Sequence, residues 1–78
     1  MKLTPVEREI LVHLLLYGDN VPSNIAKDIG RHKRSVGRSC KSLVDKELVR
    51  EKGAGVYTLR VAGVAIARDL RRKDEFNL

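Results

Sequence analysis

The sequence is poor in the residue types that catalysis, metal binding and membrane insertion require. Its 78 residues include one cysteine, two histidines, no tryptophan and only three aromatic residues of other kinds. A single cysteine cannot form an intramolecular disulfide, which is typical of a reducing environment. No apolar run approaches the roughly 20 residues of a membrane span, and the N-terminal stretch lacks the apolar core of a signal peptide. We therefore expect a cytoplasmic protein.

The few reactive side chains do not form a catalytic or metal-ligating pattern. His13 and His32 have no Cys or His partner at metal-ligand spacing, so we expect both to be structural. Cys40 lies among apolar residues at helical spacing, where a lone cysteine is more often a small core residue than a nucleophile. Gly53 and Gly55 lack the third glycine of a dinucleotide-binding fingerprint and precede a strand. The sequence therefore predicts no enzyme, no metal and no cofactor.

Positive charge is in excess and is unevenly distributed. The formal net charge is +6. Residues 1–30 contribute −1, residues 31–52 contribute +5 and residues 53–78 contribute +2. Positive charge concentrated in one segment indicates a polyanion-binding protein, although solubility alone would also tolerate this net charge. The short chain predicts one domain with a small core.

Helix caps and glycines divide the chain into elements. Thr4-Pro5-Val6-Glu7 combines a capping residue, a proline suited to the first turn and an acid that completes a capping box. Two short alternating runs around Gly53-Ala54-Gly55 predict a β-hairpin. The expected fold is mainly α with a small β-hairpin (α+β), a single domain over residues 1–78. Its expected elements are helices at about 5–17, 22–29, 33–46 and 61–73 and a hairpin at about 48–59.

The third predicted helix is strongly basic on one side. Residues 31–41 include five Lys or Arg and no acid. Val36, Cys40 and Leu43 fall at i, i+4 and i+7, which places them on one buried stripe. The basic residues on the opposite face are Arg34, Arg38 and Lys41. Such a helix suits the major groove of DNA, which admits an α-helix; the alternative is the solvated surface helix of any small protein.

The order helix, helix-turn-helix, hairpin, helix resembles the winged-helix family of DNA-binding proteins. Val21–Gly30 is similar to the second helix of that family, Val36–Val49 to its recognition helix and exit, and Gly53–Leu59 to its wing turn and returning strand. The resemblance covers about residues 4–70. Within the family, short archaeal and phage-repressor-like members are the most similar.

Two positions depart from the pattern of that family. His32 stands where members usually have Ser or Thr, which cap a helix better, so the start of the third helix is left open. Gly37 lies in mid-helix, where glycine costs about 1 kcal/mol relative to alanine. Either it lets the backbone approach a phosphate or base closely, or it is a tolerated small residue.

Candidate DNA contacts divide by role. Arg34 and Arg38 are the candidates for reading bases, because arginine pairs bidentately with guanine. The resemblance places Arg50, Lys52 and the Gly53–Gly55 tip over the adjacent minor groove or backbone. Phosphate contacts on the helix are expected from Lys33, Ser35, Lys41 and Ser42. The full candidate set is Arg31, Lys33, Arg34, Ser35, Gly37, Arg38, Lys41, Ser42, Arg50, Lys52, Gly53 and Gly55.

These observations favour a sequence-specific double-stranded DNA-binding protein, a small transcriptional regulator of the repressor type. The alternative is a winged-helix protein-interaction module, in which an exposed apolar patch would more often replace the basic face. Three aromatic residues offer no stacking platform, which counts against single-stranded RNA. The last helix either covers the first or joins two copies in a homodimer. The apolar residues expected at that homodimer interface are Ala62, Ile66, Leu70 and Phe76.

Overall fold

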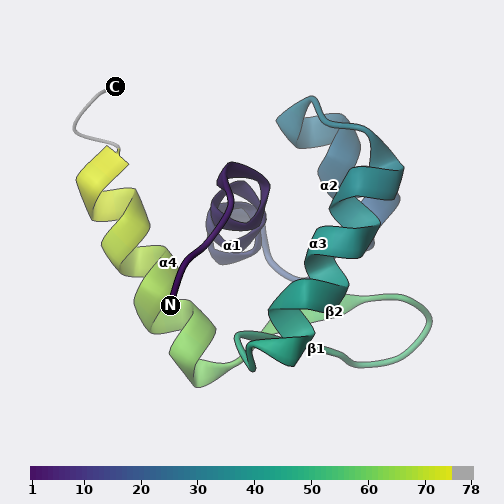
Figure 1. Cartoon of the computed structure of the whole chain (residues 1–78). Helices are drawn as coiled ribbons and strands as arrows, with labels where there is room; N and C mark the ends of the chain where they lie inside the picture. Colours follow the sequence, from purple (N-terminus) through teal and green to yellow (C-terminus); the bar gives the residue numbers. More distant parts are fainter. Residues whose placement is uncertain (75–78) are drawn as a thin grey trace.

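The first helix is defined at both ends by its own sequence. The computed structural model describes residues 1–74 of the chain, in which α1 (Pro5–Tyr17) is the first element (Figure 1). The Thr4 hydroxyl accepts a hydrogen bond from the Glu7 N–H at 3.1 Å, and the Glu7 carboxylate accepts one from the Thr4 N–H at 2.8 Å. This complete capping box confirms the predicted helix start. Gly18 ends the helix with φ 90°, in the region that favours glycine.

The next two helices form the helix-turn-helix. Helix α2 (Pro22–Ile29) ends at Gly30, whose φ of 70° and ψ of 37° are the left-handed conformation of a helix C-cap. Helix α3 (Lys33–Asp45) begins after a short turn. Its N-cap is His32, whose Nδ1 accepts a hydrogen bond from the Arg34 N–H at 3.1 Å. Histidine thus fills the capping position that Ser or Thr usually occupies, and it fixes where α3 begins.

A small antiparallel hairpin follows α3. Strands β1 (Val49–Glu51) and β2 (Tyr57–Leu59) pair with each other, and we call residues 49–59 the wing. The connection between α1 and α2 joins the same sheet through one residue. The Asn20 N–H donates to the Tyr57 carbonyl at 3.2 Å, and the Tyr57 N–H donates to the Asn20 carbonyl at 2.8 Å. These bonds attach the wing to the end of α1.

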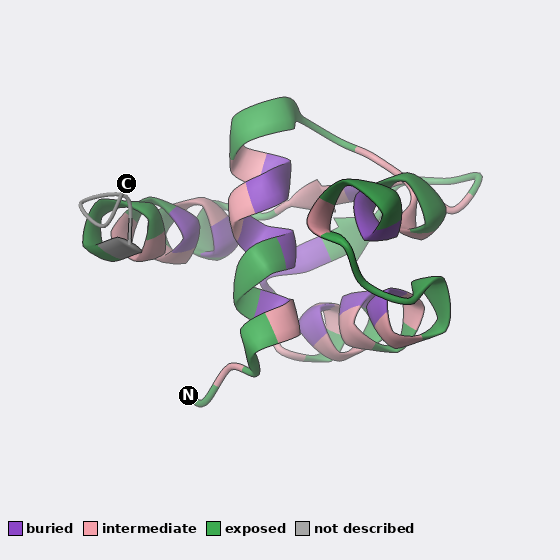
Figure 2. Cartoon of the chain, turned by 90° about the horizontal axis from the view of Figure 1, so that it is seen from above, coloured by how far each residue is buried: buried purple, intermediate pink, exposed green. Residues whose placement is uncertain are grey.

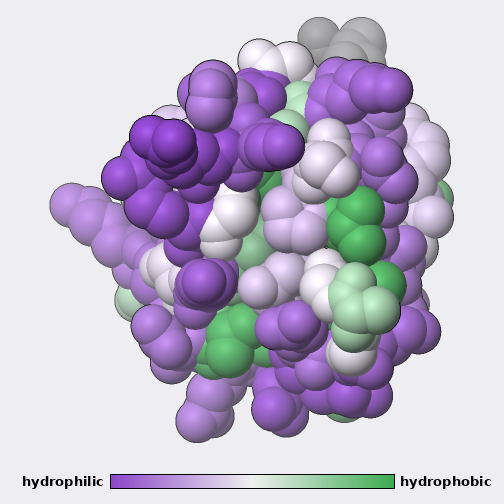
Figure 3. Space-filling model, turned by 90° about the vertical axis from the view of Figure 1, so that its right-hand side faces the viewer, coloured by the Kyte–Doolittle hydropathy of each residue, from purple (hydrophilic) through white to green (hydrophobic). Residues whose placement is uncertain are grey.

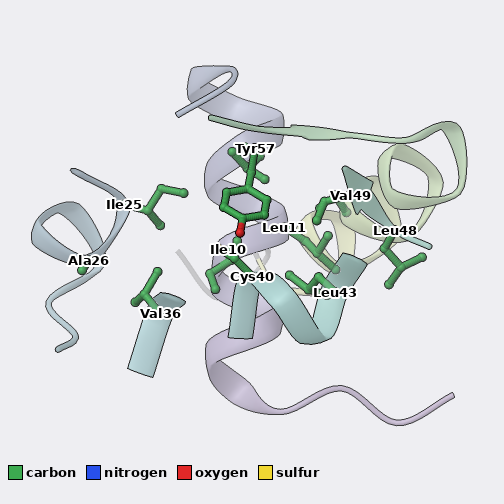
Figure 4. Close-up of a cluster of buried hydrophobic side chains, with 12 residues drawn as sticks. Ile10, Leu11, Ile25, Ala26, Val36, Cys40, Leu43, Leu48, Val49 and Tyr57 are labelled. Atoms are coloured by element: carbon green, nitrogen blue, oxygen red, sulfur yellow. The ribbon is translucent and has the colours of Figure 1, made fainter. Parts of the chain in front are cut away.

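Helix α1 lies at the centre of the fold, with α2 and α3 on one side and α4 (Val61–Asp74) on the other (Figures 1 and 2). Buried residues line the inward faces of these helices, and the stripe of Val36, Cys40 and Leu43 is fully buried as predicted (Figure 4). None of the helices in residues 1–74 is long and apolar enough to cross a membrane. The buried apolar residues are Ile10, Leu11, Leu14, Ile25, Ala26, Val36, Cys40, Leu43, Leu48, Val49, Tyr57 and Ala67.

The buried face of α4 is made partly of small residues. Gly63 and Ala67 are buried, whereas Ala62, one of the apolar residues expected at a homodimer interface, is exposed. Ile66 and Leu70 are partly buried against the core. Small residues four positions apart allow the backbone of α4 to approach its neighbours closely, and a search for bulky apolar residues misses such a face. The fold class is confirmed, since the described residues form four helices and a two-stranded hairpin.

Candidate nucleic-acid interface

The fold turns the basic face of α3 toward solvent. Because Val36, Cys40 and Leu43 are 0% exposed against the rest of the core, the opposite side of the helix must point outward. The four basic side chains of α3 that are exposed are Lys33, Arg34, Arg38 and Lys41. We call these four residues the basic face. The side of the molecule that lies on the right in Figure 1, where α2, α3 and the wing are found, is largely hydrophilic, with only small apolar areas (Figure 3).

Two further candidates on α3 lie at the edges of this face. Gly37 is half-buried, and a Cβ built on it would have no atom within 4 Å. Packing within the protein therefore does not require glycine at this position. Ser35 is half-buried and lines a small groove with Arg38, between α3 and the start of α1. Ser35 thus faces the groove between α3 and α1, which Ser42 also lines.

Ser42 is not brought to the basic face. Its hydroxyl donates to Oε2 of Glu7 at 2.7 Å, in the first turn of α1. Glu7 is 1% exposed, and its carboxylate also accepts hydrogen bonds from Lys46 Nζ at 2.7 and 2.8 Å. A buried carboxylate needs such donors, because an unpaired buried charge is costly. In the free protein the Ser42 hydroxyl therefore serves the packing of α3 against α1, and a phosphate would have to compete with Glu7 for it.

Arg31 precedes α3 and already has a partner. Its guanidinium donates two hydrogen bonds to the two carboxylate oxygens of Glu9 in α1, at 2.9 and 3.0 Å. Both side chains remain accessible to solvent, at 38% and 42%. In the free protein Arg31 thus holds the helix-turn-helix against α1, and a phosphate would have to compete with Glu9 for it.

The wing supplies exposed cations and a turn built on glycine. Arg50 and Lys52 are both exposed, and Lys52 Nζ lies 2.7 Å from Oδ2 of Asp19. Gly53 and Gly55 have φ values of 115° and 74°, which L-residues with side chains rarely adopt. The turn conformation alone accounts for these two glycines, so they need no ligand to explain them.

Reactive side chains elsewhere are used structurally. His13 is buried in α1, and its Nε2 lies 2.8 Å from Oδ2 of Asp28 in α2. Cys40 is fully buried, as predicted, and burial raises its pKa to about 11. Within residues 1–74, no group of three or more His, Cys, Asp or Glu could hold a metal ion. A groove of about 1000 Å³ between α1, the end of α2 and Arg71 is lined by no residue of α3 or the wing.

Comparison with solved structures identifies the fold. Wild-type Lactococcus lactis ZitR superposes with a TM-score of 0.86 at 24% identity over 97% of this chain. The adhesin competence repressor AdcR of Streptococcus pyogenes gives a TM-score of 0.84 at 21% identity over 97% of the chain. The transcriptional regulator Tm0710 of Thermotoga maritima gives 0.78 at 17% identity over 96%. No protein-family model matches the sequence, and no curated protein is significantly similar to it.

The compared structures are longer than this chain, which covers 54%, 60% and 56% of them respectively. All three come from bacteria, so they lend no support to a closer resemblance to archaeal or phage-repressor-like members. What they share with the chain over nearly its whole length is one arrangement of helices and hairpin. The described residues therefore have the winged-helix fold, as the order of elements in the sequence predicts.

Proposed function

We propose that this protein binds double-stranded DNA sequence-specifically and acts as a small transcriptional regulator, of the repressor type. Helix α3 would enter the major groove, and the wing would contact the adjacent backbone or minor groove. Two of the compared structures are described as a repressor and a transcriptional regulator, which supports a regulatory role for the shared fold.

The observation that carries this proposal is the outward basic face on a helix whose other side is fully buried. A free-standing charged helix could rotate or bend, but the buried stripe of Val36, Cys40 and Leu43 fixes which side of α3 is presented. Base reading requires side chains held in a fixed register on the groove. Helix α3, the second helix of the helix-turn-helix, thus presents its basic side chains from a fixed face.

The proposal is tested by selecting bound sequences from random duplex DNA and titrating the winner with salt. Sequence-specific binding should enrich one motif. The logarithm of affinity should fall against the logarithm of salt with a slope of about −0.9 for each phosphate neutralised. No enrichment would exclude sequence-specific binding, and a flat response between about 50 and 200 mM salt would exclude DNA binding as the function.

Base-reading and phosphate-contacting residues should respond differently to substitution. Arg34→Ala should cost about 1–3 kcal/mol on the selected site and relax preference at one or two base pairs. Lys41→Ala should weaken binding to all duplexes alike and reduce the salt slope by about 1. The control is Arg68→Ala, which removes an exposed cation on α4 and should leave both the sequence preference and the salt slope unchanged. Competition between selected and scrambled duplexes measures the effects, and identical behaviour of the first two variants would refute the assigned roles.

The interaction-module alternative predicts an exposed apolar patch where the basic face lies. Lys33, Arg34, Arg38 and Lys41 occupy that position instead, and the side of the molecule seen in Figure 3 is largely hydrophilic. Charged residues are depleted at the centres of protein interfaces. These features favour a nucleic acid over a protein as the ligand of α3.

A homodimer through α4 forms part of the same proposal. Two copies related by a twofold axis would read half-sites about 34 Å apart, or a multiple of that distance. Ala62 is exposed, and Ile66 and Leu70 are only partly buried, so apolar surface remains on α4; Phe76 lies outside the described residues. Leu70→Glu should then sediment as a monomer, and it should bind DNA more weakly than the wild type. A wild-type monomer, with and without its duplex, would rule out the dimer.

A further inference from the structure

An acidic residue lies among the cations of the wing. Oδ2 of Asp19, on the connection between α1 and α2, accepts a hydrogen bond from Lys52 Nζ at 2.7 Å. Hydrogen bonds from Lys52 and Thr58, and the charges of Lys52 and Arg50, hold the pKa of Asp19 below its ordinary value against the opposing effect of burial. Three groups of the wing thus act on one carboxylate.

The geometry of the hairpin explains why these groups converge. Lys52 directly follows β1, and its N–H donates to the Val56 carbonyl at 2.9 Å, which continues the pairing of the hairpin. Side chains two residues apart in an extended chain point to the same side, which groups Arg50 with Lys52. Thr58 is directly opposite Arg50 on the paired strand. The backbone hydrogen bonds between Asn20 and Tyr57 hold the α1–α2 connection against β2. Asp19, the residue before Asn20, therefore lies next to the side of the hairpin that carries Lys52.

The pair between Asp19 and Lys52 is open to water. The side chains of Lys52 and Asp19 are 45% and 36% exposed. An exposed ion pair contributes little to stability, so replacing one anionic partner by another costs little free energy. A carboxylate and a phosphate diester both present anionic oxygens to ammonium and hydroxyl donors. The side chains that bind the Asp19 carboxylate can therefore also bind a phosphate.

We propose that Arg50, Lys52 and Thr58 form a binding site for one phosphate of the DNA backbone, and that the Asp19 carboxylate occupies this site in the free protein. The proposal rests on the proposed DNA-binding function. On binding, the phosphate displaces Asp19 from Lys52, so Asp19 competes with DNA and lowers its affinity. The sequence gives no sign of this competition, because Asp19 and Lys52 are 33 residues apart.

A double-mutant cycle tests the competition. Asp19→Asn keeps the shape of the side chain and removes its charge. We expect the affinity for the selected duplex to rise about two- to five-fold, the range of a weak exposed ion pair. In a Lys52→Met background the same substitution should produce no such rise, because the freed cation is absent. Circular dichroism confirms that each variant is folded.

Glu51→Gln is the matched control. It removes one negative charge, as Asp19→Asn does, but Glu51 makes no ion pair with Lys52. It should change affinity by the same factor in both backgrounds. A fall or no change in affinity with Asp19→Asn, or an equal rise with Lys52→Met present, would overturn the proposal.

Failure of the DNA-binding function itself is distinguishable from failure of this site. If neither the wild type nor Asp19→Asn binds any duplex, titration with pyrophosphate monitored by NMR still tests the anion site. The amide signals of Lys52 and Thr58 should then shift more in Asp19→Asn than in the wild type. Equal or absent shifts would overturn the site.

Discussion

Replacing Gly63 by alanine should strongly destabilise the domain, by about 3 kcal/mol or more. A Cβ at this position would overlap the backbone carbonyl of Leu48. That carbonyl also accepts a hydrogen bond from the Arg60 N–H at 2.9 Å, so it cannot move without losing the start of α4. For a domain of this size the melting temperature should fall by about 12 °C or more, which thermal unfolding followed by circular dichroism measures.

Gly37→Ala is the matched control, because it also replaces a glycine inside a helix. No atom lies within 4 Å of the added Cβ, so the higher helix propensity of alanine should stabilise the fold by up to about 1 kcal/mol. If α3 approaches DNA closely at this point, the same variant should bind DNA more weakly although it is more stable. A Gly63→Ala protein that melts like the wild type would contradict the packing of α4 against Leu48.

The features that the sequence predicts correctly depend on residues close together in the chain. The capping box of Thr4 and Glu7 spans a single turn, and the stripe of Val36, Cys40 and Leu43 spans two. Such patterns are dictated by the helical repeat alone. They determine that a helix forms and which of its faces is buried, and for this fold they are sufficient to predict the class.

The features that the sequence does not predict depend on partners far apart in the chain. Ser42 is a polar residue beside the basic face, and only the position of Glu7, 35 residues earlier, shows that its hydroxyl points inward. Gly63 has no side chain to be noticed, and its importance comes from the carbonyl of Leu48. Charge counts likewise overestimate the free cations, since Arg31 and Lys52 each pair with an acid.

The buried acid Glu7 should be the second large contributor to stability. Its carboxylate accepts hydrogen bonds from Lys46 Nζ, the Ser42 hydroxyl and the Thr4 N–H, so it joins the first turn of α1 to the end of α3. Glu7→Gln keeps the capping box, because glutamine also serves there, but it removes the charge that Lys46 faces. We expect a loss of about 2–3 kcal/mol in the free energy of unfolding. Urea denaturation at neutral pH measures this loss.

The same residue should control part of the acid sensitivity of the fold. Burial raises the pKa of Glu7, but the hydrogen bonds from Lys46, Thr4 and Ser42 outweigh it and leave the pKa below its ordinary value. A lowered carboxyl pKa contributes stability that is fully present above the pKa of the unfolded chain, about 4.3. This contribution is lost as the pH falls through the lower pKa of the folded state. The difference between wild type and Glu7→Gln should therefore shrink on acidification.

Glu9→Gln separates this effect from the general loss of a salt bridge. Glu9 lies two residues later in α1, and its pair with Arg31 is exposed, so its removal should cost at most about 1 kcal/mol. Asp19 and Asp69 also have lowered pKa values, and both remain in the Glu7→Gln protein, so some acid sensitivity should persist. Equal losses for Glu7→Gln and Glu9→Gln would mean that burial adds nothing to the Glu7 pair. The orientation of α3 on α1 would then depend on its apolar stripe alone.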